Sequence, residues 1–181
     1  MFHCLSDVWL DHPETFVGLA RIFDRCIEAE AIPYIVILCG NFTSRGIPQG
    51  NSREIQAYQG KSLSLFETYE LKDVQENFDR LAELIASYPV IARNTHFVFV
   101  PGPFDITANS ILPRRPLLSS FVNKLNSKLA KPHFLSNPCR IKCFGQEIVI
   151  YRDDMMARML RNLVGVKPDI HDDDMKRFVS Y

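Results

Sequence analysis

Two long runs of apolar and β-branched residues constrain the fold of this chain more than any other feature. The runs are YIVILC at residues 34–39 and HFVFV at residues 96–100. Neither run alternates polar and apolar residues, which favours strands that are covered on both faces, as in parallel sheets. A shorter run, FHCLS at residues 2–6, is predicted to be a further strand. The sequence therefore predicts an α/β fold built on a central sheet.

Three amphipathic helices are predicted in the segments that connect and follow these strands. Asp11 is predicted to cap the first helix, which has Pro13 in its first turn. The apolar residues at helical spacing are Phe16, Leu19, Phe23 and Ile27 in the first helix, Leu71, Val74, Phe78, Leu81 and Ile85 in the second, and Phe121, Leu125 and Leu129 in the third. The first 40 residues thus predict a right-handed β-α-β unit.

Two other segments carry structural signals. RIKCF and EIVIY flank Gly145 and Gln146, which predicts a β-hairpin. A helix that begins at Asp153 or Asp154 is predicted after the hairpin, ended by Gly165. Its apolar residues are Met156, Met159, Leu160 and Leu163. Residues 40–70 are polar and rich in glycine, so they form either a mobile insertion or a partner-binding loop, and both interpretations stay open.

Composition limits the class of protein. A chain of 181 residues is long enough for one domain with a sizeable core. Lys+Arg and Asp+Glu are 21 each, and this zero net charge argues against a general electrostatic grip on nucleic acid, although a local basic patch remains compatible with it. No apolar run is long enough to cross a membrane. Five cysteines without a regular framework indicate reduced thiols in an intracellular protein.

The three predicted strands end in SDVWLD, CGNFTS and PGPFD. The order and spacing of these segments resemble those of the calcineurin-like metallophosphoesterases. Members of that family carry D-x-H, G-D and G-N-H-[DE] after the corresponding strands and use them to hold two divalent metals. The resemblance implies a sandwich of β sheets flanked by helices.

The ligand set of that family is broken in this chain. Asp7 keeps the first carboxylate, but Trp9 replaces the histidine, and an indole N–H is a donor without a lone pair for a metal. Asn41 replaces the bridging aspartate with a neutral amide. Pro103 and Phe104 replace the Asn-His pair.

Asp105 is the second carboxylate that remains. Asp7 and Asp105 are expected to accept backbone N–H bonds, and Phe104 is expected to fill the former metal space. We therefore expect no catalytic residue, no metal ligand and no cofactor, and the six positions Asp7, Trp9, Asn41, Pro103, Phe104 and Asp105 are interpreted as a degenerate site.

Other chemistry-bearing residues receive structural interpretations. Trp9 is expected to be buried in the core, with an interface anchor as the alternative. Cys139 and Cys143 are expected on one face of a strand, as core residues and not as metal ligands. The histidines His96, His133 and His171 are expected to be isolated surface or core residues. The arginines Arg114, Arg115 and Arg152 are expected to be solvated or salt-bridged surface residues in preference to DNA contacts. The methionines Met155, Met156 and Met159 are expected to pack in the core, with an adaptable interface as the alternative.

A closer resemblance covers most of the chain. LSDVWLD, LCGNFTS, FVFVPGPFD with ILPRRPL, SNPCRI, and EIVIYRDDM with RN occur in this order between residue 5 and about residue 162. Together these motifs resemble the B subunits of eukaryotic replicative DNA polymerases, the alpha/epsilon B-subunit family, and GNFTS and NPCRI are most similar to its epsilon members.

This resemblance implies a non-catalytic scaffold that supports chromosomal DNA replication in the nucleus. In the family, an inactive phosphoesterase domain pairs with an oligonucleotide-binding-type domain and docks the cysteine-rich C-terminal region of the catalytic subunit. Other replisome subunits are implied as partners, with weak DNA contact by this domain alone and no membrane contact. The alternatives are an active metal-dependent phosphodiesterase or phosphatase with an altered ligand set, a B subunit of the alpha or delta polymerase, and a DNA-binding module.

Residues 1–181 are predicted to form a single inactive phosphoesterase-like domain. The family's oligonucleotide-binding-type and helical N-terminal modules do not precede Met1, and its last strands do not follow Tyr181. The chain is therefore expected to be a fragment or a shortened gene product, incomplete at both ends.

Overall fold

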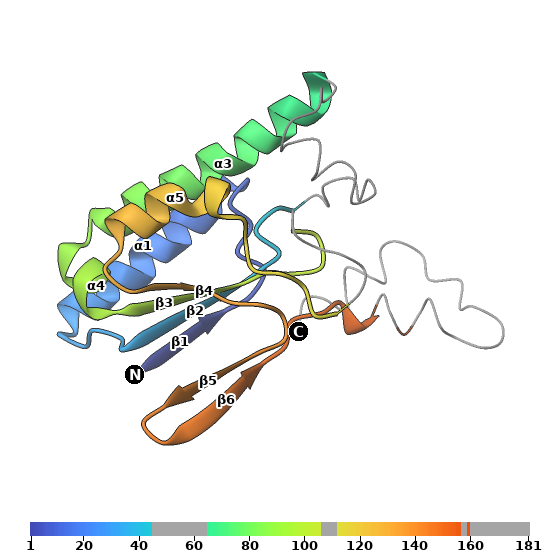
Figure 1. The fold of residues 1–181 in the computed structure, drawn as a ribbon. Helices are drawn as coiled ribbons and strands as arrows, with labels where there is room; N and C mark the ends of the chain where they lie inside the picture. Colours follow the sequence, from blue (N-terminus) through green and yellow to red (C-terminus); the bar gives the residue numbers. More distant parts are fainter. Residues whose placement is uncertain (45–64, 106–111, 157–158, 160–181) are drawn as a thin grey trace.

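The chain folds into a parallel sheet with helices on one face and a β-hairpin on the other. The computed structural model describes residues 1–44, 65–105, 112–156 and 159 (Figure 1). The elements in chain order are β1 (Phe2–Leu5), α1 (Pro13–Glu28), β2 (Ile35–Cys39), α3 (Leu65–Ala86), α4 (Pro89–Asn94), β3 (His96–Val100), α5 (Ser119–Lys128), β4 (Pro132–Phe134), β5 (Cys139–Cys143) and β6 (Gln146–Ile150). The predicted α/β class is confirmed.

Within the described residues, the main sheet has four strands in the order β1-β2-β3-β4. All three of its strand pairs are parallel, with Ile35 opposite Phe2 on one side and opposite His96 on the other. Because the strands are parallel, their carboxyl ends lie at one edge of the sheet, and the loops that follow β1, β2 and β3 meet there.

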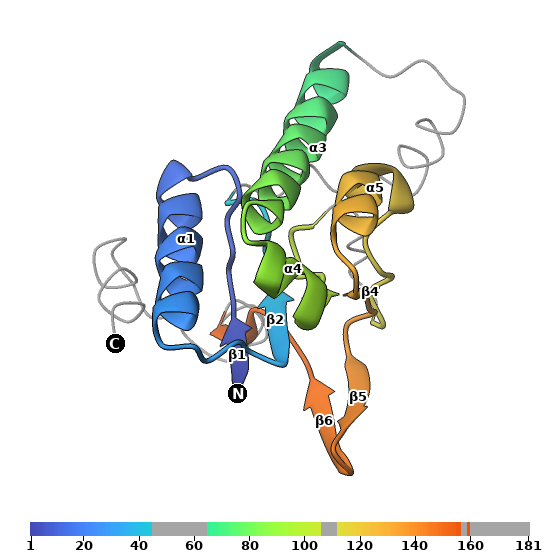
Figure 2. The same ribbon diagram turned by 90° about the vertical axis from the view of Figure 1, so that its left-hand side faces the viewer.

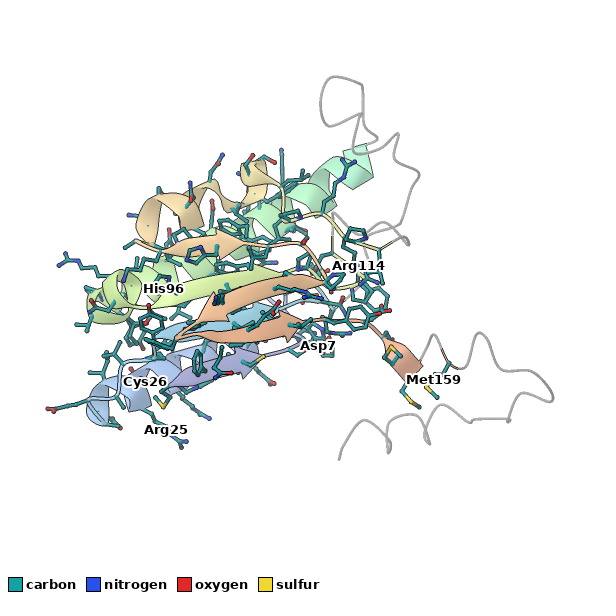
Figure 3. The ribbon with its side chains drawn as sticks, turned by 60° about the horizontal axis from the view of Figure 1, so that its bottom comes forward. Asp7, Arg25, Cys26, His96, Arg114 and Met159 are labelled. Carbon is teal, nitrogen blue, oxygen red and sulfur yellow. The ribbon has the colours of Figure 1, made fainter. Side chains whose placement is uncertain are left out.

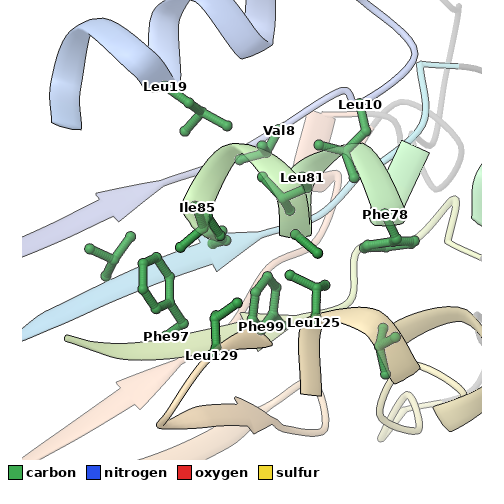
Figure 4. Packing of buried hydrophobic residues seen from close by; sticks show 14 of the residues in the cluster. Val8, Leu10, Leu19, Phe78, Leu81, Ile85, Phe97, Phe99, Leu125 and Leu129 are labelled. Atoms are coloured by element: carbon green, nitrogen blue, oxygen red, sulfur yellow. The ribbon is translucent and has the colours of Figure 1, made fainter. Parts of the chain in front are cut away.

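The helices α1, α3, α4 and α5 cover one face of the sheet (Figures 1 and 2). Phe97 and Phe99, alternate residues of β3, face this layer and are fully buried. They pack in one cluster with Leu81 and Ile85 of α3 and Leu125 of α5 (Figure 4). The amphipathic helix predicted around Val74 to Ile85 is therefore confirmed, and its apolar stripe forms the centre of this core.

The opposite face of β2 and β3 is covered by the antiparallel hairpin β5–β6. This second core contains Ile35, Ile37, Cys39, Val98 and Val100 from the sheet, Cys143 and Ile150 from the hairpin, and the partly buried Leu135, Cys139, Ile141 and Ile148. All five residues of β2 are buried, which explains its uninterrupted apolar sequence. Cys139 and Cys143 belong to the same cluster, as predicted from their spacing.

The hairpin is confirmed, but its turn lies one residue earlier than predicted. Phe144 and Gly145 form the two-residue connection, with φ of 48° and 79° respectively. Positive φ at both central residues is the requirement of a type I′ turn, which matches the twist of the flanking strands. Gln146 is accordingly the first residue of β6 and not part of the turn.

The beginning of α1 differs from the prediction. Its N-cap residue is His12, without a side-chain capping bond. The Asp11 carboxylate instead accepts hydrogen bonds from the Ser44 backbone N–H at 3.0 Å and the Ser44 hydroxyl at 2.5 Å. Asp11 thus ties the start of α1 to the loop after β2, a longer-range role that the local capping pattern did not predict.

Other boundaries also change. Helix α3 begins at Leu65, so the connection predicted at residues 40–70 ends earlier than predicted. Residues 45–64 of that connection lie outside the described part of the chain. The short elements α4 and β4 were not predicted. Ile27 is exposed on α1, and Cys26 takes the buried position next to it.

The segment after β6 is described only in part. Met155, Met156 and Met159 are exposed, so the prediction that they pack in the core is wrong. Leu160, Leu163, Gly165 and the acidic tail lie outside the described residues. None of the helices in the described part of the chain combines the length and hydrophobicity needed to cross a bilayer.

Candidate functional site

The candidate site lies at the carboxyl edge of the parallel sheet. Asp7 follows β1, Asn41 follows β2 and Asp105 belongs to the loop after β3. Figure 3 shows Asp7 and Arg114 near this edge and His96 toward the opposite end of the strands. The Asn41 Nδ2 lies 3.4 Å from Asp7 Oδ1, and Asn41 Oδ1 accepts the Phe104 N–H at 2.9 Å. The fold thus brings together the three polar residues that the sequence placed after three separate strands.

Asp105 is almost fully buried, with 5% of its surface exposed. Its Oδ1 accepts the Phe42 N–H and its Oδ2 accepts the Gly102 N–H, both at 2.7 Å. Burial raises the pKa of Asp105 to about 6, although the two backbone hydrogen bonds and the positive charge of Arg152 oppose this rise. The predicted loop-capping role of Asp105 is confirmed, since both of its oxygens are engaged by backbone donors.

Asp7 forms a different set of contacts from the one predicted. Its Oδ1 forms an ion pair with Arg152 Nη2 at 2.5 Å. The described contacts of the carboxylate are with the side chains of Arg152, Asn41 and Ser6 and not with a backbone N–H, so the prediction that it caps a loop is wrong. The backbone of Asp7 adopts φ of 55°, a left-handed conformation that aspartate tolerates better than most residues.

Arg152, which follows β6, is the residue that joins the hairpin to this edge. Its Nε donates to the carbonyl oxygen of Gly40 at 2.9 Å, while Nη2 binds Asp7. One guanidinium therefore contacts the ends of both β1 and β2. The prediction of a salt-bridged residue is confirmed for Arg152, but its position inside the candidate site was not predicted.

Asn137 and Arg114 hold the backbone of Arg152 in place. Asn137 is fully buried; its Nδ2 donates to the carbonyl oxygens of Pro101 and Arg152, and its Oδ1 accepts the Arg152 N–H. The backbone groups of Asn137 and Arg114 exchange two hydrogen bonds of 2.7 and 3.0 Å. Nearly all polar groups of the Asn137 side chain are thus used within the fold, as a buried amide requires.

Arg114 is buried, with a relative exposure of 3%, contrary to the predicted surface position. Its guanidinium binds Asp153 Oδ1 at 2.8 Å and donates to the Arg152 carbonyl oxygen at 3.1 Å. The predicted salt bridge is therefore confirmed, but it is buried. Asp153, predicted as a helix cap, also accepts a hydrogen bond from the Tyr151 hydroxyl.

The two aromatic residues of the site are both partly exposed. Trp9 is 39% exposed, and its ring packs against His12 with ring centroids 5.5 Å apart. Phe104 is 40% exposed and takes part in the site through its backbone N–H. The prediction that Trp9 is a core residue is wrong, because more than a third of its surface is exposed. The prediction that the Phe104 ring fills the former metal space stays a prediction.

The histidines lie elsewhere. His96 Nδ1 lies 3.0 Å from His133 Nε2, so these two residues are paired and not isolated as predicted. Burial lowers the pKa of His96. His171 lies outside the described residues. Within the described ranges, no three His, Cys, Asp or Glu side chains are grouped so that they could hold a metal ion.

Arg152, Asn137 and Arg114 are the site residues that sequence reasoning did not assign to this edge. Arg152 lies 145 residues from Asp7 and 112 residues from Gly40 in the chain, so no local periodicity connects them. The available signals were the polar residues in SNPCRI and IYRDD, which interrupt otherwise apolar strand ends.

The family model described as the DNA polymerase alpha/epsilon B subunit matches residues 2–181. The B subunit of DNA polymerase epsilon from Schizosaccharomyces pombe is 37% identical over 164 residues, which cover 89% of this chain and 25% of that protein. DNA polymerase epsilon subunit 2 of Homo sapiens is 40% identical over 91% of this chain and 27% of its own length. The B subunit of DNA polymerase epsilon from Arabidopsis thaliana is 33% identical over 98% of this chain and 31% of its own length.

The chain therefore spans about a quarter to a third of the length of these curated relatives.

Two glycines allow the ends of β2 and β3 to touch. A Cβ added to Gly40 would lie 1.9 Å from Asp105 Oδ2 and 2.4 Å from the Gly102 nitrogen, which no real side chain permits. We predict that Gly40→Ala lowers the free energy of unfolding by at least about 2 kcal/mol, because the strand ends must separate. Urea denaturation measures this change.

Gly18→Ala is the matched control, because a Cβ at Gly18 in α1 meets nothing within 4 Å. It should stabilise the chain by about 0.5–1 kcal/mol through the better helix propensity of alanine. A Gly40→Ala variant as stable as the original chain would show that the two strand ends are not in contact.

A second prediction concerns the pH dependence of stability at Asp105. The pKa of about 6 in the folded chain lies above the ordinary value of 3.8, so the folded chain binds this proton more readily than the unfolded chain. The contribution of Asp105 to stability is therefore full below the ordinary pKa and is lost as pH rises through about 6.

The Asp105→Asn variant has no carboxyl group to titrate at this position. Its amide NH₂ group would face one of the two buried backbone N–H donors, and the lost hydrogen bond costs about 1–3 kcal/mol of stability. We predict that the stability difference between the original chain and this variant is larger at about pH 5 than at about pH 7.5. Denaturation curves at the two pH values test it, and a difference that stays constant or widens with pH would contradict the assignment.

Proposed function

Because the chain belongs to the B-subunit family of DNA polymerases alpha and epsilon, we propose that it is a non-catalytic accessory subunit of DNA polymerase epsilon. In this proposal it binds the cysteine-rich C-terminal region of the catalytic subunit, contacts other replisome subunits and supports chromosomal DNA replication in the nucleus. The match over residues 2–181 and the names of its relatives support the family-level role. The partner and the nuclear location are part of our proposal, since the chain covers about a quarter of the length of the first of these relatives.

We further propose that residues 1–181 form one domain of the calcineurin-like phosphoesterase type in which the hydrolytic site is degenerate. Two features support this fold. The parallel sheet presents Asp7, Asn41 and Asp105 from three successive strands at its carboxyl edge. The hairpin β5–β6 packs on the face opposite the helices and supplies the first strands of a second sheet.

The observation that carries the non-catalytic role is the engagement of both remaining carboxylates inside the chain. Both oxygens of Asp105 accept backbone N–H bonds, and Asp7 is paired with Arg152. A two-metal site requires several anionic oxygens directed at cations about 3.5–4 Å apart. Two carboxylates of which one is paired with a guanidinium and the other is occupied by backbone N–H donors are poorly suited to that task.

Zero net charge supports only weak contact with DNA by this domain, because non-specific DNA binding depends on an excess of basic residues. Protein contacts are therefore the main interactions in this proposal.

Assembly with the catalytic subunit is the direct test. We predict that the chain co-purifies with the C-terminal region of the catalytic subunit of the same organism but not with its polymerase region. Asp7→Asn should bind equally well, because the substitution removes an anionic ligand but keeps an oxygen that accepts from Arg152. Failure of the original chain to bind, although its thermal melt shows it to be folded, would contradict the proposed partner.

Absence of hydrolysis is the second test, and it addresses the alternative of an active metal-dependent phosphodiesterase. We predict no turnover of bis(4-nitrophenyl) phosphate in the presence of Mn²⁺. Asp11→Asn is the matched control, because Asp11 is a nearby loop aspartate that binds Ser44 and lies outside the site. Turnover that Asp7→Asn abolishes and Asp11→Asn preserves would favour the enzyme.

A further inference from the structure

The hairpin β5–β6 is a separate layer that depends on its contacts with the main sheet. Its two strands pair with each other in antiparallel register, from Cys139 opposite Ile150 to Cys143 opposite Gln146. They belong to a different sheet from β1–β4. The layer meets β2 and β3 through apolar side chains, which are non-directional contacts. Directional contacts at its ends must therefore fix its position.

The turn end of the hairpin is held by an aromatic contact. The ring of Phe144 packs against Tyr34, which precedes β2, with centroids 4.7 Å apart. Phe144 is nevertheless the most exposed large apolar residue in the described part of the chain, at 75%. This contact contributes little burial, so the turn end is the weaker attachment.

The opposite end is held by charge and hydrogen bonds. Arg152 comes two residues after β6 and reaches both Asp7 and the Gly40 carbonyl oxygen. Its side chain is only 16% exposed, so the ion pair is partly shielded from water. Asn137, just before β5, binds Pro101 after β3 and the backbone of Arg152. Both strands of the hairpin are therefore attached at the edge where the candidate site lies.

The charges at this edge explain why Arg152 is the decisive contact. Asp7 and Asp105 bring two carboxylates to the strand ends, and Arg152 is the cation that acts on both, through a direct ion pair with the first and through its field on the second. A neutral residue at position 152 would leave Asp7 without its ion-pair partner and the Gly40 carbonyl without this donor.

We propose that Arg152 is a latch that fastens the hairpin β5–β6 across the ends of β1 and β2. When the latch is released, the hairpin lifts from β2 and β3 while the helical layer stays folded. The inference goes beyond the accessory role proposed above and does not rest on it. Local opening of this kind requires that two layers be stabilised separately, and the two hydrophobic clusters on opposite faces of the sheet provide that separation.

The cysteines report on the two layers independently. Cys39 and Cys143 are buried in the cluster between the sheet and the hairpin. Cys26 is buried in the cluster on the helical face. Cys4 is exposed. Opening of the hairpin therefore exposes Cys39 and Cys143, whereas global unfolding exposes Cys26 as well.

The experiment is pulsed alkylation of the full chain with iodoacetamide, quantified for each cysteine by peptide mass spectrometry. In Arg152→Gln, we expect the alkylation rates of Cys39 and Cys143 to rise by about tenfold or more, since losing hydrogen bonds to a charged group shifts a local opening equilibrium by that factor. The rate of Cys26 should stay unchanged, and Cys4 serves as the exposed reference.

Two further variants sharpen the test. Arg140→Gln is the matched control, because Arg140 lies on the outer face of the same hairpin in an exposed ion pair with Glu147, and its loss should leave all rates unchanged. Arg152→Lys should fall between the original chain and Arg152→Gln, because a single ammonium keeps the attraction to Asp7 but lacks the fork that also reaches Gly40.

Two results would overturn the latch. Unchanged rates at Cys39 and Cys143 in Arg152→Gln would show that the apolar contacts and the hydrogen bonds of Asn137 hold the hairpin without the Arg152 side chain. A parallel rise at Cys26 would show that Arg152 stabilises the whole fold. Neither result bears on binding to the catalytic subunit, so the two proposals fail independently.

Discussion

The close approach of the β2 and β3 strand ends is the constraint on which the candidate site depends. Gly40 and Gly102 leave no room for a Cβ, because one at Gly40 would meet the Asp105 carboxylate and one at Gly102 would meet Asn41. That carboxylate accepts the Phe42 and Gly102 N–H groups, which would otherwise be buried without partners beyond the last ladder bonds of the sheet. Asn41, fixed between the same two loops, then binds Phe104 and approaches Asp7. Arg152 reaches Asp7 after β1 and Gly40 after β2, two strands that pair side by side in the sheet.

The parts of the fold that were predicted correctly are those in which the local sequence and the tertiary environment agree. β2 and β3 are buried on both faces, so their composition alone identifies them. The buried stripe of α3 repeats with helical spacing for the same reason. β4 has three residues at the edge of the sheet and α4 has six, and both are too short to produce a periodic signal. At Asp11 the local sequence and the tertiary environment disagree. The local pattern predicts a helix cap, but the Asp11 carboxylate binds Ser44, which is distant in the sequence.

The candidate site could be predicted only as far as its strand-end residues. The resemblance of the three strand-end motifs placed Asp7, Asn41 and Asp105 in one site, at the carboxyl edge where the loops of parallel strands meet. It did not place Arg152 or Asn137, because they arrive on the hairpin from the far end of the chain and interact through geometry that no spacing encodes. Trp9 was misjudged, since an aromatic residue in an apolar context suggests burial and its ring remains partly exposed. The chemical types of the residues were therefore predictable, and their partners were not.

The contacts of the two carboxylates separate the shape of the site from its chemistry. Asp105 is required by the backbone: two N–H donors point at its oxygens regardless of what happens in the pocket, so the presence of an aspartate here is no sign of hydrolysis. Asp7 has no such backbone role, and its charge would be free for a ligand if Arg152 were absent. The guanidinium removes that freedom by pairing the Asp7 carboxylate with an internal cation. A strand-end site of this kind keeps its geometry through hydrogen bonds and one ion pair, and the same ion pair supports the non-catalytic role proposed above.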